Sequence, residues 1–355
     1  MISLKHKELD NYINQIVPII KEYRDGELFY PLDEAHVERW IHQFDPSEHE
    51  IILRETLILL QKCYFSKRCI NLFLEEIIAT EDLWCKGNIA NELSTTQFLS
   101  IQNKGGSQAL LLNTLNNLIE EKFNQNIITN QSENTDHYIY IDDCLFSGNT
   151  LRRDLENWIL NANEGSRLDI IYLASYSSGK YYIANKVLNH LCDQKGIQFN
   201  IWTKIMLNNF TNDWYNYDCL RPKSIDNENV NNFILRLNEQ AQQNGRAIRL
   251  FREKEYYSPL FSDNRSREIF EQAMLKAGAY IYSCCASPNT SMKPMGYDFF
   301  NSLGFGAFFA TYNNISNNSP LAFWWGDPLV SNSHPFSKWY PLLPRKVNDN
   351  GLNWF

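Results

Sequence analysis

Apolar residues recur at helical spacing through the first quarter of the chain. Between Leu9 and Tyr23 they fall mostly three or four positions apart, which predicts an amphipathic helix. Asp33 is a candidate N-cap for a second helix. The segment 45–48, Asp-Pro-Ser-Glu, combines a cap residue, a first-turn proline and an acid three places on, which is typical of a helix start. We therefore expect a helical N-terminal region over residues 1–92, with later helices over 33–44, 45–64 and 66–80.

The pattern changes near residue 95, where short apolar runs begin to alternate with amphipathic segments. This alternation is typical of βαβ units and a parallel sheet. The expected strands cover 96–101, 137–142, 168–175 and 197–207. The expected helices between them cover 108–123, 150–160 and 181–192. We therefore predict an α/β core, a parallel sheet flanked by helices, over residues 93–215.

Beyond residue 215 the periodicity is weaker and aromatic residues are frequent. Helices are expected over 226–243 and 265–277, and short strands over 280–285, 306–312 and 321–325. No Gly/Ser-rich or Pro-rich linker separates this part from the rest. We therefore interpret residues 216–355 as a C-terminal elaboration packed on the core, so that the chain forms one compact unit with a helical cap.

Composition and charge narrow the classes of partner. Hydrophobic residues make up 44% of the chain, enough for a packed core, and the formal net charge is −8. Because neutralising phosphates needs a basic face, direct DNA binding is not expected. The first residues lack the apolar run of a secretory signal, no stretch is long enough for a membrane span, and the eight cysteines show no zinc spacing. We expect a cytoplasmic protein without membrane contact.

The candidate chemistry lies where one predicted strand meets the next helix. Strand 137–142 runs into Asp142 and Asp143, and Ser-Gly-Asn-Thr at 147–150 leads directly into a helix. A helix start offers unpaired backbone N–H groups and a positive dipole end, and Gly148 lets the backbone approach an anion closely. The two acids suit sugar hydroxyls or a Mg²⁺ ion held mostly through water. The predicted phosphate site consists of Ser147, Gly148, Asn149 and Thr150.

This arrangement resembles the phosphoribosyl-pyrophosphate (PRPP) motif of the type I phosphoribosyltransferases. That motif is an apolar strand, two acids, three variable residues and Thr/Ser-Gly-x-Thr/Ser, and it is matched here without insertion by Asp142, Asp143, Ser147, Gly148 and Thr150. By this resemblance the loop would hold the 5′-phosphate. The two acids would be catalytic, binding the ribose hydroxyls and stabilising positive charge at the anomeric carbon. The alternative is a strand-end acid pair of another α/β protein; a Walker-type site lacks its GxxxxGKS/T partner.

A second candidate anion site lies upstream. In the same family a loop after the first core strand binds pyrophosphate, and residues 103–107, Asn-Lys-Gly-Gly-Ser, occupy the corresponding place. Lys104 supplies a positive charge and is a further catalytic candidate. Gly105 and Gly106 permit a nest of N–H groups around an anion, and Ser107 is expected to cap the helix. Taken alone, a Gly-Gly loop is a weak signal and is more often an ordinary turn.

The C-terminal part supports a narrower resemblance. Its segments 304–306, 311–320, 323–325 and 339–345 are similar to the C-terminal part of phosphoribosyltransferase-like proteins of bacterial conflict and anti-phage systems. Some of those proteins are encoded beside retron reverse transcriptases. The amides of Asn317 and Asn318 could read a base and Trp324 could stack on a ring, so these three are candidate substrate residues. A turn between two aromatic strands is the alternative.

The resulting hypothesis is a phosphoribosyltransferase-like enzyme. The resemblance implies pentosyl (glycosyl) transfer or glycosidic-bond cleavage on a ribose 5-phosphate or nucleotide substrate, with Mg²⁺, as a toxin effector in anti-phage defence. Two alternatives remain open. One is a catalytically silent module that senses PRPP or a nucleotide, and the other is a docking subunit of a defence complex. The expected partner in that case is a protein, such as a reverse transcriptase with its RNA.

Overall fold

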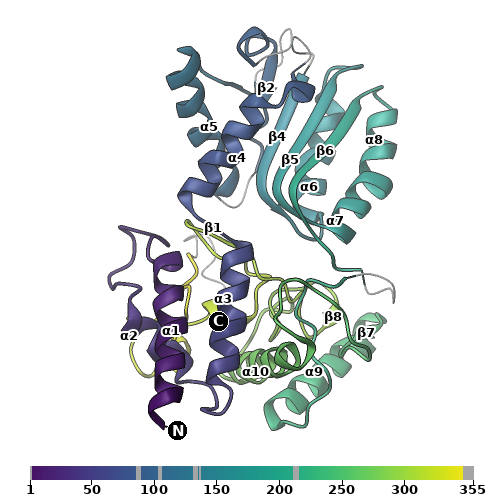
Figure 1. Cartoon of the computed structure of the whole chain (residues 1–355). Helices are drawn as coiled ribbons and strands as arrows, with labels where there is room; N and C mark the ends of the chain where they lie inside the picture. Colours follow the sequence, from purple (N-terminus) through teal and green to yellow (C-terminus); the bar gives the residue numbers. More distant parts are fainter. Residues whose placement is uncertain are drawn as a thin grey trace. The chain divides into compact units, whose positions relative to one another are not determined.

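The computed structural model describes residues 2–84, 89–102, 106–130, 135, 137–210 and 216–346. Its contacts divide the chain into two compact units (Figure 1). The first, here called the composite unit, joins Met1–Lys67 with Asp218–Phe355. The second, here called the sheet unit, is Arg68–Tyr217.

The sheet unit is built around five parallel strands in the order β3-β2-β4-β5-β6. They are β2 (Thr96–Phe98), β3 (Ile128–Thr129), β4 (His137–Leu145), β5 (Arg167–Tyr176) and β6 (Gln198–Leu207). Strands β4 and β5 are buried along almost their whole length, which explains their near-continuous apolar runs. The predicted parallel sheet flanked by helices is confirmed.

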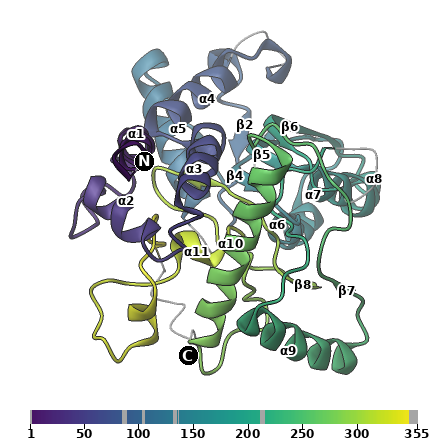
Figure 2. The ribbon, with the colours of Figure 1, turned by 60° about the horizontal axis from the view of Figure 1, so that its bottom comes forward.

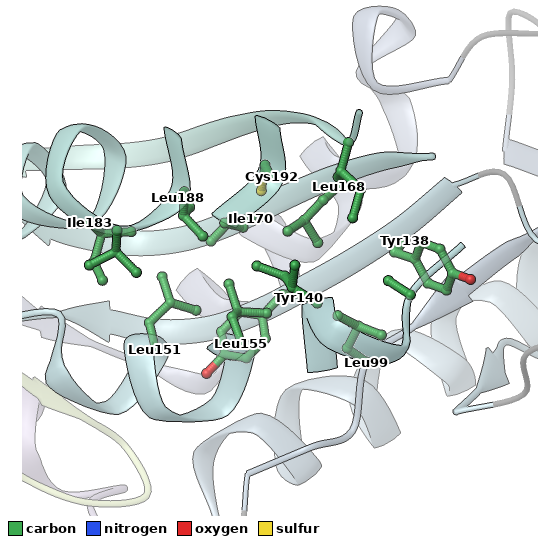
Figure 3. Close-up of a cluster of buried hydrophobic side chains, with 14 of the residues drawn as sticks. Leu99, Tyr138, Tyr140, Leu151, Leu155, Leu168, Ile170, Ile183, Leu188 and Cys192 are labelled. Carbon is green, nitrogen blue, oxygen red and sulfur yellow. The ribbon is translucent and has the colours of Figure 1, made fainter. Parts of the chain in front are cut away.

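One face of this sheet is covered by the helices that follow β4 and β5. They are α6 (Asn149–Asn161), α7 (Ser177–Tyr182), a π-helical turn (Ile183–Leu188) and α8 (Asn189–Asp193). Apolar side chains from α6 and the π-helical turn meet alternate residues of β4 and β5 in one buried core (Figure 3). This core includes Tyr138, Tyr140, Leu151, Leu155, Leu168, Ile170, Ile183 and Leu188.

The opposite face carries α4 (Lys67–Ala79). Ile201 of β6 packs against the core on the face that α6 covers. Lys204 lies three positions further along the strand, so its side chain points to the other face. There its ammonium pairs with Glu76 of α4 at 2.6 Å. Helix α5 (Ser107–Phe123) is joined to α4 by an ion pair between Lys122 and Glu75 at 3.9 Å. The sheet is therefore sandwiched between helices.

The composite unit brings the two ends of the chain together. It contains α1 (Ile2–Ile20), α2 (Glu34–Ile41), α3 (His49–Cys63), α9 (Glu228–Asn244), α10 (Asn264–Ser283) and α11 (Leu321–Trp324). Two short parallel pairs join β1 (Tyr64–Phe65) to β9 (Ala310–Thr311), and β7 (Ile248–Arg249) to β8 (Asn301–Ser302). Helices α3, α10 and α11 gather at its centre (Figure 2). None of the described helices has both the length and the apolar character needed to cross a bilayer.

Buried side chains of α2 fasten it to the C-terminal segment. Trp40 donates from Nε1 to the carbonyl oxygen of Ala322 at 2.9 Å and stacks on Phe323, with ring centroids 5.7 Å apart. The ring nitrogens of His36 lie 2.7 Å from the Tyr340 hydroxyl and 2.8 Å from the Leu342 carbonyl oxygen. These contacts join residues that are about three hundred positions apart in the chain.

Two of the three strands predicted in the C-terminal part are wrong, and the third is much shorter than predicted. Residues 280–283 belong to α10, residues 321–324 form α11, and the run 306–312 contains only the two-residue strand β9. The physical reason is that a short, fully buried apolar run carries no period that separates helix from strand.

The unit boundaries also differ from the predicted domains 1–92, 93–215 and 216–355. Residues 68–92 belong to the sheet unit, because α4 packs against the sheet and α5. The N-terminal helices and the C-terminal part form one unit rather than two separate additions.

Candidate functional site

The predicted phosphate loop lies between the carboxyl end of β4 and the start of α6. Gly148 is the N-cap residue of α6 and has a φ of 82°, in the left-handed region that favours glycine. It is buried, whereas Ser147, Asn149 and Thr150 are exposed. Since Gly148 has no side chain to cap the helix, the first-turn N–H groups and these neighbouring hydroxyls suit an anion.

This loop rests on the helical segment that follows β5. A Cβ atom at Gly179 of α7 would lie 1.8 Å from the carbonyl oxygen of Phe146. A Cβ atom at Gly148 would lie 2.5 Å from Cγ1 of Ile183 in the π-helical turn. These close approaches fix the loop backbone. Sequence analysis missed Gly179; the only available signal was a glycine four positions after a predicted strand.

The two strand-end acids have different surroundings. Asp142 is 6% exposed, while Asp143 is partly buried. Oδ1 of Asp142 accepts hydrogen bonds from Ser107 Oγ at 2.8 Å and from the Asp143 N–H at 2.9 Å, and Oδ2 accepts from Gln102 Nε2 at 2.5 Å. Burial raises the pKa of the Asp142 carboxyl above its usual range, although these hydrogen bonds act in the opposite direction.

The polar network continues from Asp142 into the core. Gln102 Nε2 also donates to the Tyr140 hydroxyl at 3.0 Å, and that hydroxyl donates to Asp154 Oδ2 at 3.3 Å. Burial raises the pKa of Asp154 and raises that of Tyr140 well above its usual range, so Tyr140 keeps its proton at neutral pH. Sequence analysis missed all three residues, because no motif marks a glutamine, a core tyrosine or a mid-helix acid.

The second predicted anion loop is described only in part. Lys104 and Gly105 lie outside the described residues, and their pyrophosphate-binding and catalytic roles stay predictions. Gly106 is the N-cap of α5 and makes no side-chain cap, and Ser107 is the first helical residue. Ser107 therefore does not cap the helix as expected. Its hydroxyl donates to Asp142 instead, which joins the start of α5 to strand β4.

The described side chains do not form a direct metal site. Among residues 2–84, 89–102, 106–130, 135, 137–210 and 216–346, no group of three or more His, Cys, Asp or Glu residues could hold an ion. Both oxygens of Asp142 accept hydrogen bonds from the protein, so direct Mg²⁺ ligation would compete with these donors, whereas contact through water would not require their loss. The metal role predicted for Asp142 and Asp143 stays a prediction, and no chemical step below depends on it.

The three candidate substrate residues of the C-terminal part lie in the composite unit. Trp324 is buried, and its Nε1 donates to the Ser319 carbonyl oxygen at 2.7 Å. Asn318 Nδ2 donates to the Tyr297 carbonyl oxygen at 2.8 Å, and the Asn317 carbonyl accepts from the Tyr297 N–H at 2.8 Å. These contacts hold the segment around Tyr297 against the loop before α11. A substrate role for the three residues stays a prediction.

A parallel sheet with two acids near the carboxyl end of its central strand, followed by a loop suited to an anion, is typical of phosphoribosyltransferase-like proteins. The family model PRTase-CE matches residues 37–345, most of the chain, including residues of both units. The chain therefore belongs to the PRTase-CE family. The phosphoribosyltransferase-like part of the sequence resemblance is thereby confirmed, whereas the retron and anti-phage association stays a prediction.

Individual relatives are distant. No curated protein matches the chain. Among solved structures, it is similar to the xanthine-guanine-hypoxanthine phosphoribosyltransferase of Helicobacter pylori, with 12% identity, 40% of this chain and 89% of that chain covered, and a TM-score of 0.25. It is also similar to the AQ2163 protein from Aquifex aeolicus, with 14% identity, 53% and 89% covered, and a TM-score of 0.25. At these scores neither likeness carries an argument about function.

Proposed function

We propose that this chain is an enzyme that breaks or transfers the bond at the anomeric carbon of a ribose 5-phosphate or nucleotide substrate. The observation that carries the proposal is the β4–α6 junction, where the partly buried Asp143 precedes an exposed, uncapped helix start held by Gly148 and Gly179. That start suits a phosphate, and a nearby carboxylate suits the sugar that carries it.

In the proposed reaction, positive charge develops at the anomeric carbon as its bond to the leaving group breaks. The bond between the anomeric carbon and its substituent breaks, and both bonding electrons leave with the base or diphosphate. Positive charge develops on the sugar, and the Asp143 carboxylate stabilises it. Water or another acceptor then donates an electron pair to the anomeric carbon and loses a proton. Lys104 would hold a departing anion, and Mg²⁺ enters the proposal only as the counter-ion of a diphosphate substrate.

We further propose that this activity serves as a toxin effector in bacterial anti-phage defence. Support comes from the C-terminal segments, which resemble those of phosphoribosyltransferase-like proteins of such systems. The proposed partner is another protein of the same defence system, such as a reverse transcriptase with its RNA. Co-expression of a candidate partner should suppress growth arrest caused by the wild-type chain.

A second candidate function is binding of PRPP or a nucleotide without turnover. The observation that favours it is the state of Asp142, which is buried and hydrogen-bonded on both oxygens. Such a site has one acid fewer to stabilise a developing cation, but it still has a loop suited to phosphate.

The deciding experiment incubates the purified chain with PRPP or with single nucleotides and identifies products by mass spectrometry. We expect free base, diphosphate or ribose 5-phosphate from the wild type and none from Asp143→Asn. The matched control is Asp193→Asn, an exposed acid at the end of α8, which should keep full activity. Binding by the wild type without product would establish the sensing function. Absence of both binding and product would refute both functions.

A further inference from the structure

The hydrogen bonds of Asp142 reach the β2–α5 segment on both sides of residues 103–105. Gln102 immediately precedes these residues and donates from Nε2 to Oδ2 at 2.5 Å. Ser107 follows them, at the start of α5, and donates from Oγ to Oδ1 at 2.8 Å. One buried carboxyl therefore holds both ends of a short stretch of chain.

A second side chain reinforces the same junction. Gln108 of α5 accepts at Oε1 from the N–H groups of Ile101 and Gln102, at 3.0 and 3.1 Å. Its Nε2 lies 3.4 Å from the carbonyl oxygen of Ile141, the residue before Asp142. Gln108 is buried, so these bonds are shielded from competing water. The segment that flanks residues 103–105 is thus built onto the end of β4.

Asp142 has little capacity left for a ligand. Its Oδ1 already accepts two hydrogen bonds and its Oδ2 accepts one, and the residue is 6% exposed. Asp143 is more exposed and follows on the alternate side of the strand. The two acids of the motif are therefore not equivalent.

We infer that Asp142 is a positioning residue, which fixes Gln102 and the start of α5 against the strand that leads into the phosphate loop, and that Asp143 is the acid that meets the ribose. The inference deepens the proposed function and rests on it. A substrate with phosphate groups at both ends of the sugar needs two anion sites at a fixed separation. Asp142 joins the segment that flanks one predicted anion site to the strand that leads into the other.

The inference predicts that loss of Asp142 weakens the binding of a ligand with two phosphorylated positions more than the binding of a ligand with one. Asp142→Asn replaces one acceptor oxygen by an amide donor, which opposes the amide of Gln102 on one side or the N–H of Asp143 on the other. We expect the Kd for PRPP to rise about tenfold, and that for ribose 5-phosphate to change less than about threefold. Asp143→Asn should weaken both ligands alike, because both carry the ribose hydroxyls. Calorimetry with the two ligands measures the difference.

A reversed pair distinguishes positioning from direct contact. In the wild type the Gln102 amide donates to the Asp142 carboxylate. In Asp142→Asn/Gln102→Glu the new amide at 142 can donate to the new carboxylate at 102, so the hydrogen bond is restored with donor and acceptor exchanged. We expect this double variant to regain most of the PRPP affinity that Asp142→Asn loses. Circular dichroism and thermal unfolding check that each variant folds; if Asp142→Asn does not, Ser107→Ala, which removes one donor, should show the same selective loss.

The possible failures are distinguishable. Equal loss of PRPP and ribose 5-phosphate in Asp142→Asn, without recovery in the double variant, would overturn the positioning role and leave the proposed function standing. An equal loss in Ser107→Ala, where that variant is needed, would have the same meaning. A wild-type chain that binds neither ligand would overturn this inference, whereas the proposed function would still be decided by the incubations with nucleotides described above.

Discussion

Gly148 satisfies two constraints that disfavour any residue with a side chain, one on its backbone conformation and one on the space around it. Its φ of 82° is costly for other residues, and an added Cβ would lie 2.5 Å from Ile183. The sequence predicted this residue, because a glycine between two hydroxyl residues after an acid pair is a local motif. It did not predict Gly179, Gln102 or Tyr140, whose partners come from other elements. Local patterns thus identify the ligand-facing residues better than the residues that support them.

Gly148→Ala should weaken phosphate binding beyond its cost in stability. The matched control is Gly165→Ala, because Gly165 also has a positive φ, 70°, but an added Cβ there meets open space. We expect each variant to lose about 1 kcal/mol of stability from backbone strain, with a further loss in Gly148→Ala from the clash with Ile183. Only Gly148→Ala should lose affinity for ribose 5-phosphate in calorimetry. Unchanged affinity would remove this loop from the site.

Strand β5 was predicted to within one residue at each end, whereas β4 continues three residues past its predicted end and includes Asp143. Helices α10 and α11 were predicted less well, since apolar runs inside the composite unit carry no clear period.

Strands β4 and β5 hold a polar cluster that no sequence motif signals. At their amino ends, away from the phosphate loop, Asp169 lies 2.7 Å from His137, 2.6 Å from Arg167 and 2.6 Å from Trp202 Nε1.

Asp169 should make the stability of the sheet depend on pH. Burial alone would raise the pKa of this carboxyl, but hydrogen bonds from His137, Trp202 and Arg167 outweigh burial and lower it. A lowered folded-state pKa means that the contribution is present above the unfolded value of about 4 and is lost as the pH falls through the folded value. Asp169→Asn should cost about 3 kcal/mol at pH 7, because it leaves Arg167 without its buried counter-charge.

Urea unfolding of wild type and Asp169→Asn at several values between pH 7 and pH 3 tests this. The difference in unfolding free energy should shrink below about pH 4. A difference that stays constant across the range would show that the carboxylate charge is not what stabilises these strands. Asp193→Asn is again the control, since this acid is exposed and should change stability by less than about 0.5 kcal/mol.

At the scale of the whole molecule, a helix near the start of the chain packs against a segment near its end. The PRTase-CE family model spans residues 37–345, so it includes most of α2 at one end and the segment that packs on α2 at the other. Sequence periodicity could not show this closure, because it concerns residues within one element. The contacts of Trp40 with Ala322 and Phe323 depend on residues that meet only after the chain has folded.

The closure predicts that a single α2 substitution loosens segments at both ends of the chain. Trp40 is fully buried, so Trp40→Ala should cost about 3–5 kcal/mol through lost packing and the orphaned Ala322 carbonyl. Hydrogen exchange should rise in residues 34–41 and 321–343, and much less in β5. The reciprocal variant Leu155→Ala, in the core of the sheet unit, should raise exchange in β4 and β5 and spare α2. If Trp40→Ala instead raises exchange equally in β5, the two units unfold as one cooperative body. In that case both variants should lose the proposed toxin activity at the same temperature.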